Sequence, residues 1–394
     1  MQACSGYRIL DLTHVLAGPY ASYQLAVLGA EVIKIEPPAN PDMVRAVGAV
    51  SADNAQGMGA DFQTQAANKR ALSLDLSRPE GADIFRELVA TADVVVENYQ
   101  AGSLDRLGLG ADALIAINPR LIVCSINGYG QTGPKAGRPS YDAVIKAASG
   151  WLAAQHRTQV AAEMVIGPSI FDYATGQAAA FAITSALLRR ERTGLGQRLD
   201  VSMLDAALAL MSVDITNLFA GTEAVGPEKW ANQGHPGYRL YDTADGVLMA
   251  GAWTADQTVR FWHVLGRPDY AIASAGRSIT DLETASLDVI AEVQTIMLTR
   301  TADSWEQLLN DADVPASRVR SLAEACADPQ VTERGSIHTF PGGSSHTVAA
   351  FTSPTDGPQV TSPPARVGQD SDAILRELGK SDDEIASLHL RGVI

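Results

Sequence analysis

The first two hundred residues alternate short apolar runs with segments of helical periodicity, and this alternation limits the possible folds more than any other feature. The apolar runs are bounded by glycine, proline or polar residues and predict buried strands at residues 7–12, 30–36, 71–76, 93–97, 121–126 and 198–202. Helices are expected between them, for instance over residues 79–91. Strands in alternation with helices are typical of a parallel sheet with helices on both faces. The sequence therefore predicts a doubly wound, Rossmann-like α/β domain.

The pattern changes after about residue 220. Strand-like runs at residues 238–242 and 246–250 are joined by the turn Ala244-Asp-Gly246, which predicts an antiparallel pair followed by helices. Prolines then mark a loop-rich return, and the last two amphipathic helices are expected to pack back on the first domain. We thus expect a large α/β domain, a second, smaller α+β domain, and a linker with a C-terminal return, over residues 1–220, 221–320 and 321–394.

Charge and cysteine content narrow the classes of partner. The net charge of −15 disfavours nucleic acid and anionic membranes, because both attract surfaces rich in Lys and Arg. The three cysteines lie far apart in the sequence, which fits a reducing compartment. No basic segment followed by an apolar one stands at the N-terminus, so no signal peptide is predicted. We expect a cytoplasmic protein that binds neither nucleic acid nor membranes.

One carboxylate, Asp172, stands at the start of a long apolar helix among small residues such as Gly167, Ser169 and Gly176. The small neighbours leave room for a bulky substrate, and no His, Lys or Cys in the adjoining sequence competes as a nucleophile. The alternative role is a helix N-cap, because an Asp there accepts a backbone N–H and its charge suits the positive end of the helix dipole. On spacing alone the cap is the commoner role, so both stay open at this point.

Several common site motifs are missing from the sequence. No GxGxxG follows the first predicted strand and no GxxxxGK[ST] occurs, so neither nicotinamide binding nor a P-loop is favoured. GxSxG does not occur either. The seven histidines show no HxxxH or HExxH spacing, and no carboxylate cluster suggests a cation site. We therefore expect no metal site.

Short sequence blocks typical of one protein family are spread along nearly the whole chain. They are Val15–Tyr20, Leu28–Pro37, Asn68–Arg70, Asp93–Asn98, Leu104–Gly108, Asn118–Arg120, Gly128–Pro134, Thr193–Gln197, Gly234–Pro236 and Thr243–Gly246. In this order they resemble the class III coenzyme A transferases, the CaiB/BaiF type. That superfamily includes formyl-CoA transferase, carnitine-CoA transferase and α-methylacyl-CoA racemase.

The resemblance implies transfer of coenzyme A from an acyl-CoA thioester to a free carboxylic acid, with CoA and acyl-CoA as substrates and no prosthetic group. Asp172 matches the family's nucleophilic aspartate, which forms an aspartyl anhydride and then an aspartyl-CoA thioester. Gln233 and Gly234 match a mobile loop over the aspartate, whereas from the residues alone Gly234-His-Pro236 reads equally as a tight turn. The resemblance also implies an interlocked homodimer.

The same resemblance implies that coenzyme A lies against Val15, Leu16, Ala17, Asn98, Tyr99, Arg106, Leu107, Tyr129 and Met203. Arg106 stands out because a phosphate favours a guanidinium and basic residues are few in so acidic a chain. Without the resemblance, Arg106 reads equally as a surface ion-pair partner of Asp105 or Asp112. Two positions depart from the family pattern: some relatives carry Gln at Leu16, and some carry a basic residue at Ser77. A formyl-type substrate is therefore not expected.

Two other functions remain as alternatives. A racemase of this superfamily needs a second base, a His where this chain has Tyr141, and a glutamate where it has Thr254. Both substitutions disfavour racemization. His14 and His235 are the other candidate bases, although a histidine in a site is more often structural. The second alternative is a non-catalytic CoA-binding protein, which the intact Asp172 disfavours. The sequence does not predict which acids are donor and acceptor.

Overall fold

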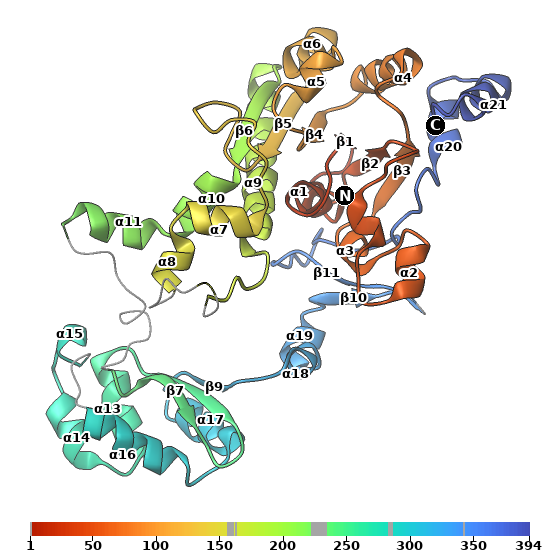
Figure 1. Ribbon diagram of the computed structural model, residues 1–394. Helices are drawn as coiled ribbons and strands as arrows, with labels where there is room; N and C mark the ends of the chain where they lie inside the picture. Colours follow the sequence, from red (N-terminus) through yellow and green to blue (C-terminus); the bar gives the residue numbers. More distant parts are fainter. Residues whose placement is uncertain (1, 156–160, 162–163, 222–234, 283–286, 342) are drawn as a thin grey trace. The chain divides into compact units, whose positions relative to one another are not determined.

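The computed structural model describes residues 2–155, 161, 164–221, 235–282, 287–341 and 343–394 (Figure 1). The chain forms two compact units, each with its own hydrophobic core. The first unit holds Met1–Leu152, Val165–Ser212 and Pro329–Ile394, and the second unit holds Ala153–Met164 and Val213–Asp328. The domain limits expected from the sequence stay predictions.

The first unit is built on a six-stranded sheet in which each neighbouring pair of strands is parallel. The strand order is β3-β2-β1-β4-β5-β6. The strands are β1 (Arg8–Asp11), β2 (Glu31–Glu36), β3 (Lys69–Ser73), β4 (Val94–Glu97), β5 (Ile122–Asn127) and β6 (Gln197–Ser202). The order reverses between β1 and β4, which is the switch point of a doubly wound sheet. The predicted Rossmann-like fold is confirmed.

Helices cover both faces of this sheet, and successive strand residues face opposite sides. Along β1, Ile9 belongs to one hydrophobic cluster and Leu10 to the other. The cluster of Ile9 draws on α1 (Ala17–Ala26), α9 (Ile170–Thr193) and α10 (Met203–Leu210). The cluster of Leu10 draws on α4 (Pro79–Val89), α6 (Ala111–Ile117), α20 (Ser371–Glu377) and α21 (Asp382–Leu390). The C-terminal helices are therefore part of the core of the first unit.

The returning C-terminal chain also covers the edge strand β3. The Ala71 N–H donates to the Asp370 carboxylate at 2.8 Å, and the Asp370 N–H donates to the Ala71 carbonyl at 2.9 Å. The Ser73 N–H donates to the Ser371 hydroxyl at 3.0 Å. The edge amides of β3 are thus satisfied by residues almost three hundred positions later in the chain.

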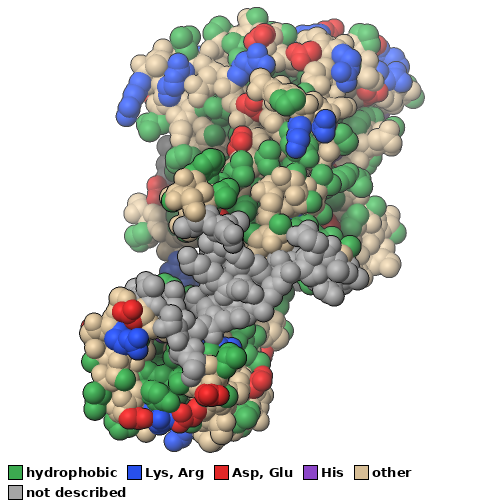
Figure 2. Space-filling view, turned by 60° about the vertical axis from the view of Figure 1, so that its left-hand side comes forward, with side chains coloured by type: hydrophobic (Ala, Val, Ile, Leu, Met, Phe, Trp, Pro, Cys, Tyr) green, Lys and Arg blue, Asp and Glu red, His purple; other side chains and the backbone are tan. Residues whose placement is uncertain are grey.

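Shorter elements connect these parts of the chain: η1 (Met43–Ala46), α2 (Ser51–Ala55), α3 (Ala60–Gln63), α5 (Ser103–Arg106), α7 (Asp142–Ala148), α8 (Trp151–Gln155), α11 (Ser212–Phe219) and α19 (Pro329–Glu333). β10 (Ile337–Thr339) and β11 (Ser345–Thr347) form a small antiparallel pair. On the face of the first unit drawn in Figure 2, basic and acidic side chains are interspersed rather than gathered into a basic surface.

The second unit packs helices on a small antiparallel sheet. Its strands are β7 (Tyr238–Asp242), β8 (Val247–Gly251) and β9 (Ala316–Arg318), with β8 in the middle. Its helices include α13 (Ala255–Val264), α14 (Pro268–Ser274), α15 (Ile279–Leu282), α16 (Leu287–Met297), α17 (Ala302–Asp311) and α18 (Leu322–Cys326). The core contains buried aromatic side chains, among them Tyr241, Phe261 and Trp305. Within the described ranges of both units, no helix combines the length and the apolar character needed to cross a bilayer.

Candidate active site

The loops that follow β1 and β4 meet at the switch point of the sheet. The His14 N–H donates to the side-chain oxygen of Asn98 at 2.8 Å, and the Asn98 side-chain NH₂ donates to the His14 carbonyl at 2.8 Å. This reciprocal pair ties the two loops together. Ligands of open α/β sheets bind outside the carboxyl ends of the strands at this point. The topology alone therefore indicates a ligand site at these loops.

Two cavities open beside these loops, and Asp172 borders both. The first, of about 440 Å³, is lined by six of the nine residues expected to contact CoA, namely Val15, Leu16, Ala17, Asn98, Tyr99 and Met203. The second, of about 500 Å³, also has Val15, Leu16 and Asp172 in its wall, together with Asp61, Tyr173 and the segment 166–169. Tyr141 is common to both walls and is 60% exposed. A group attached to Asp172 is thus within reach of either cavity.

The other three expected CoA contacts lie outside these two walls. Leu107 lines a smaller cavity of about 150 Å³, which has Tyr99 in common with the first cavity. Arg106 is exposed beside Leu107 and donates to the Ser103 hydroxyl at 2.9 Å. Within the described ranges Arg106 has no ion pair, and Asp112 pairs with Arg198 instead. Tyr129 is half-buried and packs against the cluster of Ile9.

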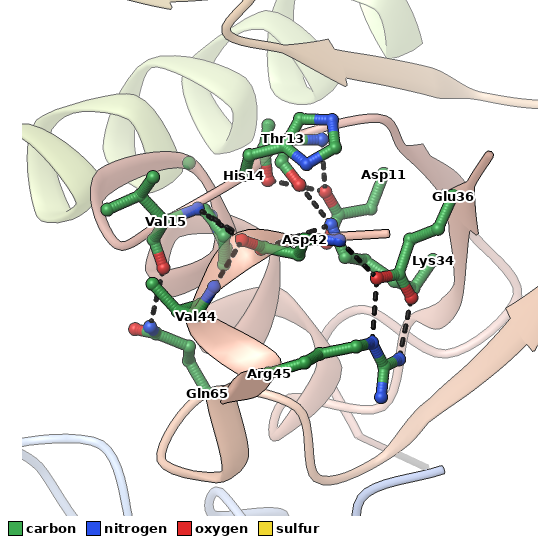
Figure 3. A network of polar contacts seen from close by, with 12 residues as sticks. Asp11, Thr13, His14, Val15, Lys34, Glu36, Asp42, Val44, Arg45 and Gln65 are labelled. Atoms are coloured by element: carbon green, nitrogen blue, oxygen red, sulfur yellow. Dashed lines mark hydrogen bonds and ion pairs between the residues drawn. The ribbon is translucent and has the colours of Figure 1, made fainter. Parts of the chain in front are cut away.

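Val15, which borders both cavities, has a strained backbone. Its φ of 69° lies in the left-handed region that β-branched residues avoid. The Val15 N–H donates to both carboxylate oxygens of Asp42 at 3.1 Å, and the Val15 carbonyl accepts from the Gln65 side-chain NH₂ at 3.0 Å (Figure 3). Two polar side chains from the following segments therefore hold the turn that carries the cavity wall.

A buried charge network supports Asp42 (Figure 3). The Asp42 N–H donates to Glu36 at 3.0 Å, and the Arg45 guanidinium donates to both Glu36 oxygens at 2.8 and 2.6 Å. The Lys34 ammonium lies 3.8 Å from the Asp42 carboxylate and donates to the Thr13 carbonyl. All four charged side chains are almost fully buried. Paired charges of this kind resist rearrangement, because breaking one pair leaves its partner buried and unpaired.

Asp172 lies in the first turn of α9 rather than at its cap. The helix begins at Ile170, and Ser169 is the N-cap residue, without a side-chain capping hydrogen bond. The Phe171 N–H is instead satisfied by the Asp142 carboxylate at 2.8 Å. The Asp172 carboxylate is therefore not the group that caps this helix.

The environment of Asp172 changes its ionisation. Burial and, to a smaller extent, the nearby Asp142 carboxylate raise the pKa of Asp172 to about 7, although Lys146 opposes them. Burial and the Lys34 charge lower the pKa of His14, which also lines the first cavity. The ionised form of Asp172, which is the form that can act as a nucleophile, is therefore the main form above about pH 7.

Two polar residues that line the first cavity were not predicted from the sequence as site residues. Arg138 follows Gly137 in the wall and supplies a cation there. Asn127 ends β5, and both polar atoms of its side chain are buried without a partner among the described residues. The glycine-rich block that follows Asn127 was the only feature of the sequence that indicated this wall, and it did not indicate which side chains line it.

The remaining residues predicted for the site are not among the described residues that line these cavities. Gln233 and Gly234 lie outside the described residues. The adjacent His235 is fully buried in the second unit and its Nδ1 accepts from the Gly237 N–H at 3.1 Å. Over the described part of the chain, no three His, Cys, Asp or Glu side chains are grouped so that they could hold a metal ion.

Known proteins resemble this chain in sequence and in fold. It is 36% identical to a succinate–glutarate CoA-transferase of Agrobacterium fabrum over 84% of this chain and 83% of the relative. It is 32% identical to a succinyl-CoA:glutarate CoA-transferase of Homo sapiens over 99% of this chain and 89% of the relative. Its fold matches the crystal structure of a CaiB/BaiF family protein from Brucella suis with a TM-score of 0.79, at 29% identity over 96% of this chain and 99% of that one. Residues 4–371 match CoA-transferase family III. These matches confirm the resemblance drawn from the sequence and the expected class of enzyme, and the chain belongs to CoA-transferase family III.

Proposed function

We propose that this enzyme moves coenzyme A from an acyl-CoA to a small free carboxylic acid, and that Asp172 is the covalent nucleophile. The observation that carries the proposal is the place of Asp172 between two cavities, with a pKa of about 7. A nucleophile that borders two cavities can react with a thioester on one side and a carboxylate on the other. The relatives named for glutarate transfer act on a carboxylic acid and a CoA thioester.

The chemistry needs only the carboxylate and the two substrates. Ionised Asp172 attacks the thioester carbonyl, the C–S bond breaks, and CoA leaves as a thiolate from the mixed anhydride. The thiolate then attacks the aspartyl carbonyl, which releases the donor acid as a carboxylate and leaves an aspartyl-CoA thioester. The acceptor carboxylate repeats these steps in reverse and restores Asp172. No net proton is taken up or released.

We assign the CoA moiety to the first cavity and to the smaller cavity that follows it. Tyr99 lies in both walls, so an elongated ligand can run from one to the other. Arg138 in the wall of the first cavity and the exposed Arg106, the sequence neighbour of Leu107 in the smaller cavity, supply positive charge for the phosphates of CoA. The second cavity then remains for the acids. Its wall combines small and apolar residues with the carboxylates of Asp61, Asp142 and Asp172, of which Asp61 is exposed.

A trapping experiment tests the nucleophile. The enzyme is incubated with an acyl-CoA and hydroxylamine, which converts an activated Asp172 into a hydroxamate detectable in the peptide by mass spectrometry. Asp172→Asn should abolish the hydroxamate and lower turnover by at least about a thousandfold, while CoA still binds. Near-normal turnover of this variant, with deamidation back to Asp excluded, would contradict the proposal.

A solvent-exchange experiment separates transfer from racemization. A 2-methylacyl-CoA incubated in D₂O should gain no deuterium at its α-carbon, because Tyr141 stands where a racemase needs its second base. Thr254, the position of the racemase glutamate, caps α13 and accepts from the Gln257 N–H at 3.2 Å. Rapid exchange that depends on Asp172, without CoA transfer to any acid, would indicate the racemase branch.

We also propose that the enzyme is a homodimer. The exposed side of α9 carries Phe181 and Leu188, which are 76% and 59% exposed, and their spacing of seven residues puts them on one face. Exposed apolar side chains aligned on a helix are typical of an interface. Light scattering should give the mass of two chains, and Phe181→Glu should shift the protein toward monomers. A monomeric native protein at micromolar concentration would contradict this part of the proposal.

A further inference from the structure

Helix α7 carries a buried ion pair that faces the start of α9. The Lys146 ammonium lies 2.5 Å from the Asp142 carboxylate, and the two residues are 1% and 5% exposed. A buried pair of opposite charges is retained only where its geometry and its further hydrogen bonds are good. The remaining hydrogen bonds of this pair therefore show what it holds.

Both members of the pair hold the segment that leads to Asp172. The Lys146 ammonium donates to the Ile166 carbonyl at 3.0 Å and to the Pro168 carbonyl. The Asp142 carboxylate accepts from the Phe171 N–H at 2.8 Å. Residues 166–171 are thus tied at both ends to α7, and Asp172 is the next residue along the chain.

Packing secures the neighbouring side chain but not the carboxylate itself. Phe171 is fully buried and its ring meets Trp151 edge-on, with 5.3 Å between the ring centroids. No hydrogen bond to the Asp172 carboxylate is found among the described residues. Its position therefore depends on the backbone to which it is attached.

We propose that the Asp142–Lys146 pair positions the Asp172 carboxylate between the two cavities. This inference rests on the proposed role of Asp172 as the nucleophile. The pair holds the backbone on the N-terminal side of Asp172, while its two charges act on the same carboxylate in opposite senses. Asp142 raises the pKa of Asp172, and Lys146 lowers it.

Other ionisable groups surround Asp172 without forming such a link. Tyr173 stands next to it on α9, and the Tyr20 ring of α1 meets the Tyr173 ring edge-on at 4.8 Å between centroids. The remaining ionisable groups in the two cavity walls are His14, Asp61, Tyr99, Arg138 and Tyr141. Among the described residues, the α7 pair alone both ties the segment before Asp172 and acts on its charge, so its removal has a distinctive signature.

The experiment compares Asp142→Asn and Lys146→Met in the full-length enzyme. Each variant should lower the rate of hydroxamate formation at Asp172 about tenfold to hundredfold, because a displaced nucleophile meets the thioester less often in a reactive geometry. The acid limb of the kcat/KM profile should move to lower pH in Asp142→Asn and to higher pH in Lys146→Met. A pair that only stabilises the fold would not move this limb in opposite directions.

Asp93→Asn provides a matched control. Asp93 pairs at 2.9 Å with Arg190, a side chain buried at the other end of α9, about 28 Å from Phe171 at 1.5 Å per residue. This variant should lower the melting temperature but leave the acid limb and the trapping rate in place. It separates effects at the start of α9 from general loosening of the helix.

The outcomes distinguish the positioning role from the proposed function. The native enzyme is expected to form the hydroxamate at Asp172. If it does, and if both variants keep the native rate of hydroxamate formation and the native acid limb, the positioning role alone would be overturned. An acid limb that moves in the same direction in both variants would also overturn it. Absence of an Asp172 adduct in the native enzyme would instead contradict the proposed function. If Lys146→Met does not fold, Asp142→Asn decides the result by itself.

Discussion

The Val15 N–H is held at 3.1 Å from both carboxylate oxygens of Asp42, in a residue whose φ is 69°. A valine in the left-handed region costs of order 1–3 kcal/mol and persists only where its surroundings impose it. Here the imposing groups are the Asp42 carboxylate on one side and the Gln65 side chain on the other. The strained conformation of Val15 therefore helps to set the shape of the wall that the two cavities have in common.

Asp42→Asn should relax this turn and weaken substrate binding. The amide keeps one accepting oxygen but loses the charge that faces Lys34, so Val15 is held less firmly. We expect the KM for acyl-CoA to rise about tenfold, with a smaller loss in kcat, as steady-state kinetics would measure. Asp83→Asn is the control, because Asp83 is an exposed partner of Arg86 on α4. Equal KM values in the two variants would contradict the role of Asp42.

The pH dependence of kcat/KM should report the titration of Asp172. Only the ionised carboxylate is a nucleophile, and burial together with Asp142 raises its pKa to about 7. Activity should therefore be full above this value and should fall about tenfold per pH unit below it. Initial rates at low substrate concentration between pH 5 and 9 would show the limb. A profile that stays flat down to pH 5 would mean that the carboxylate is ionised more easily than its surroundings imply.

Asn127→Ala should affect the bound state more than the free protein. The buried carboxamide of Asn127 has no partner among the described residues, so its loss removes no hydrogen bond from the unliganded enzyme. A bound CoA amide or carbonyl would supply that partner, and a hydrogen bond of about 0.5–1.5 kcal/mol corresponds to about twofold to thirteenfold in KM. Thermal melts should give the native melting temperature without ligand and a smaller shift with CoA. An unchanged shift would show that CoA does not bind this side chain.

Lys69→Met should destabilise the fold. The Lys69 ammonium lies 2.9 Å from the Asp11 carboxylate, and both side chains are almost fully buried. Removing one partner of a buried pair costs about 3–5 kcal/mol. Arg8→Met, which breaks a half-exposed pair with Glu31, should cost at most about 1 kcal/mol. Denaturant unfolding compares the two, and similar losses would contradict this account.

The same variant should change the response to acid. Burial raises the pKa of Asp11, but Lys69, Lys34 and two hydroxyl groups outweigh it and bring the pKa below the ordinary value. The pair therefore contributes stability above about pH 4, and this contribution is lost as the pH falls through the folded-state pKa. Without Lys69, the part of the acid-induced loss that comes from Asp11 should shrink. An identical loss between pH 5 and 3 in both proteins would argue against the pairing.

The sequence predicted which segments form the sheet better than it predicted where each strand begins and ends. The predicted strand at residues 71–76 lies instead at Lys69–Ser73, because Leu74 and Leu76 stay in the core after the strand has ended. The Asp75 N–H bonds the Val393 carbonyl at 2.8 Å, a partner too distant in the chain for any local pattern to reveal. β9, β10 and β11 are three residues long, which is too short for an alternating pattern to stand out.

The candidate site was predictable only in part. The topology brings Asn98 to the loop of Val15 and Leu16, and all three residues line one cavity, whereas their contact with CoA stays a prediction. The left-handed Val15 was not predictable, because the residue type opposes that conformation and only tertiary contacts impose it. The Asp142–Lys146 pair has the spacing of an ordinary surface pair, and nothing in the sequence shows that it is buried.

The covered edge of β3 has a consequence for the nascent chain. The groups that satisfy its amides belong to Asp370 and Ser371, so they emerge from the ribosome long after the strand itself. Until then the sheet exposes an unpaired edge, which is the kind of surface through which strands of different molecules join. The risk of such pairing is therefore highest during the interval in which the rest of the chain is being synthesised.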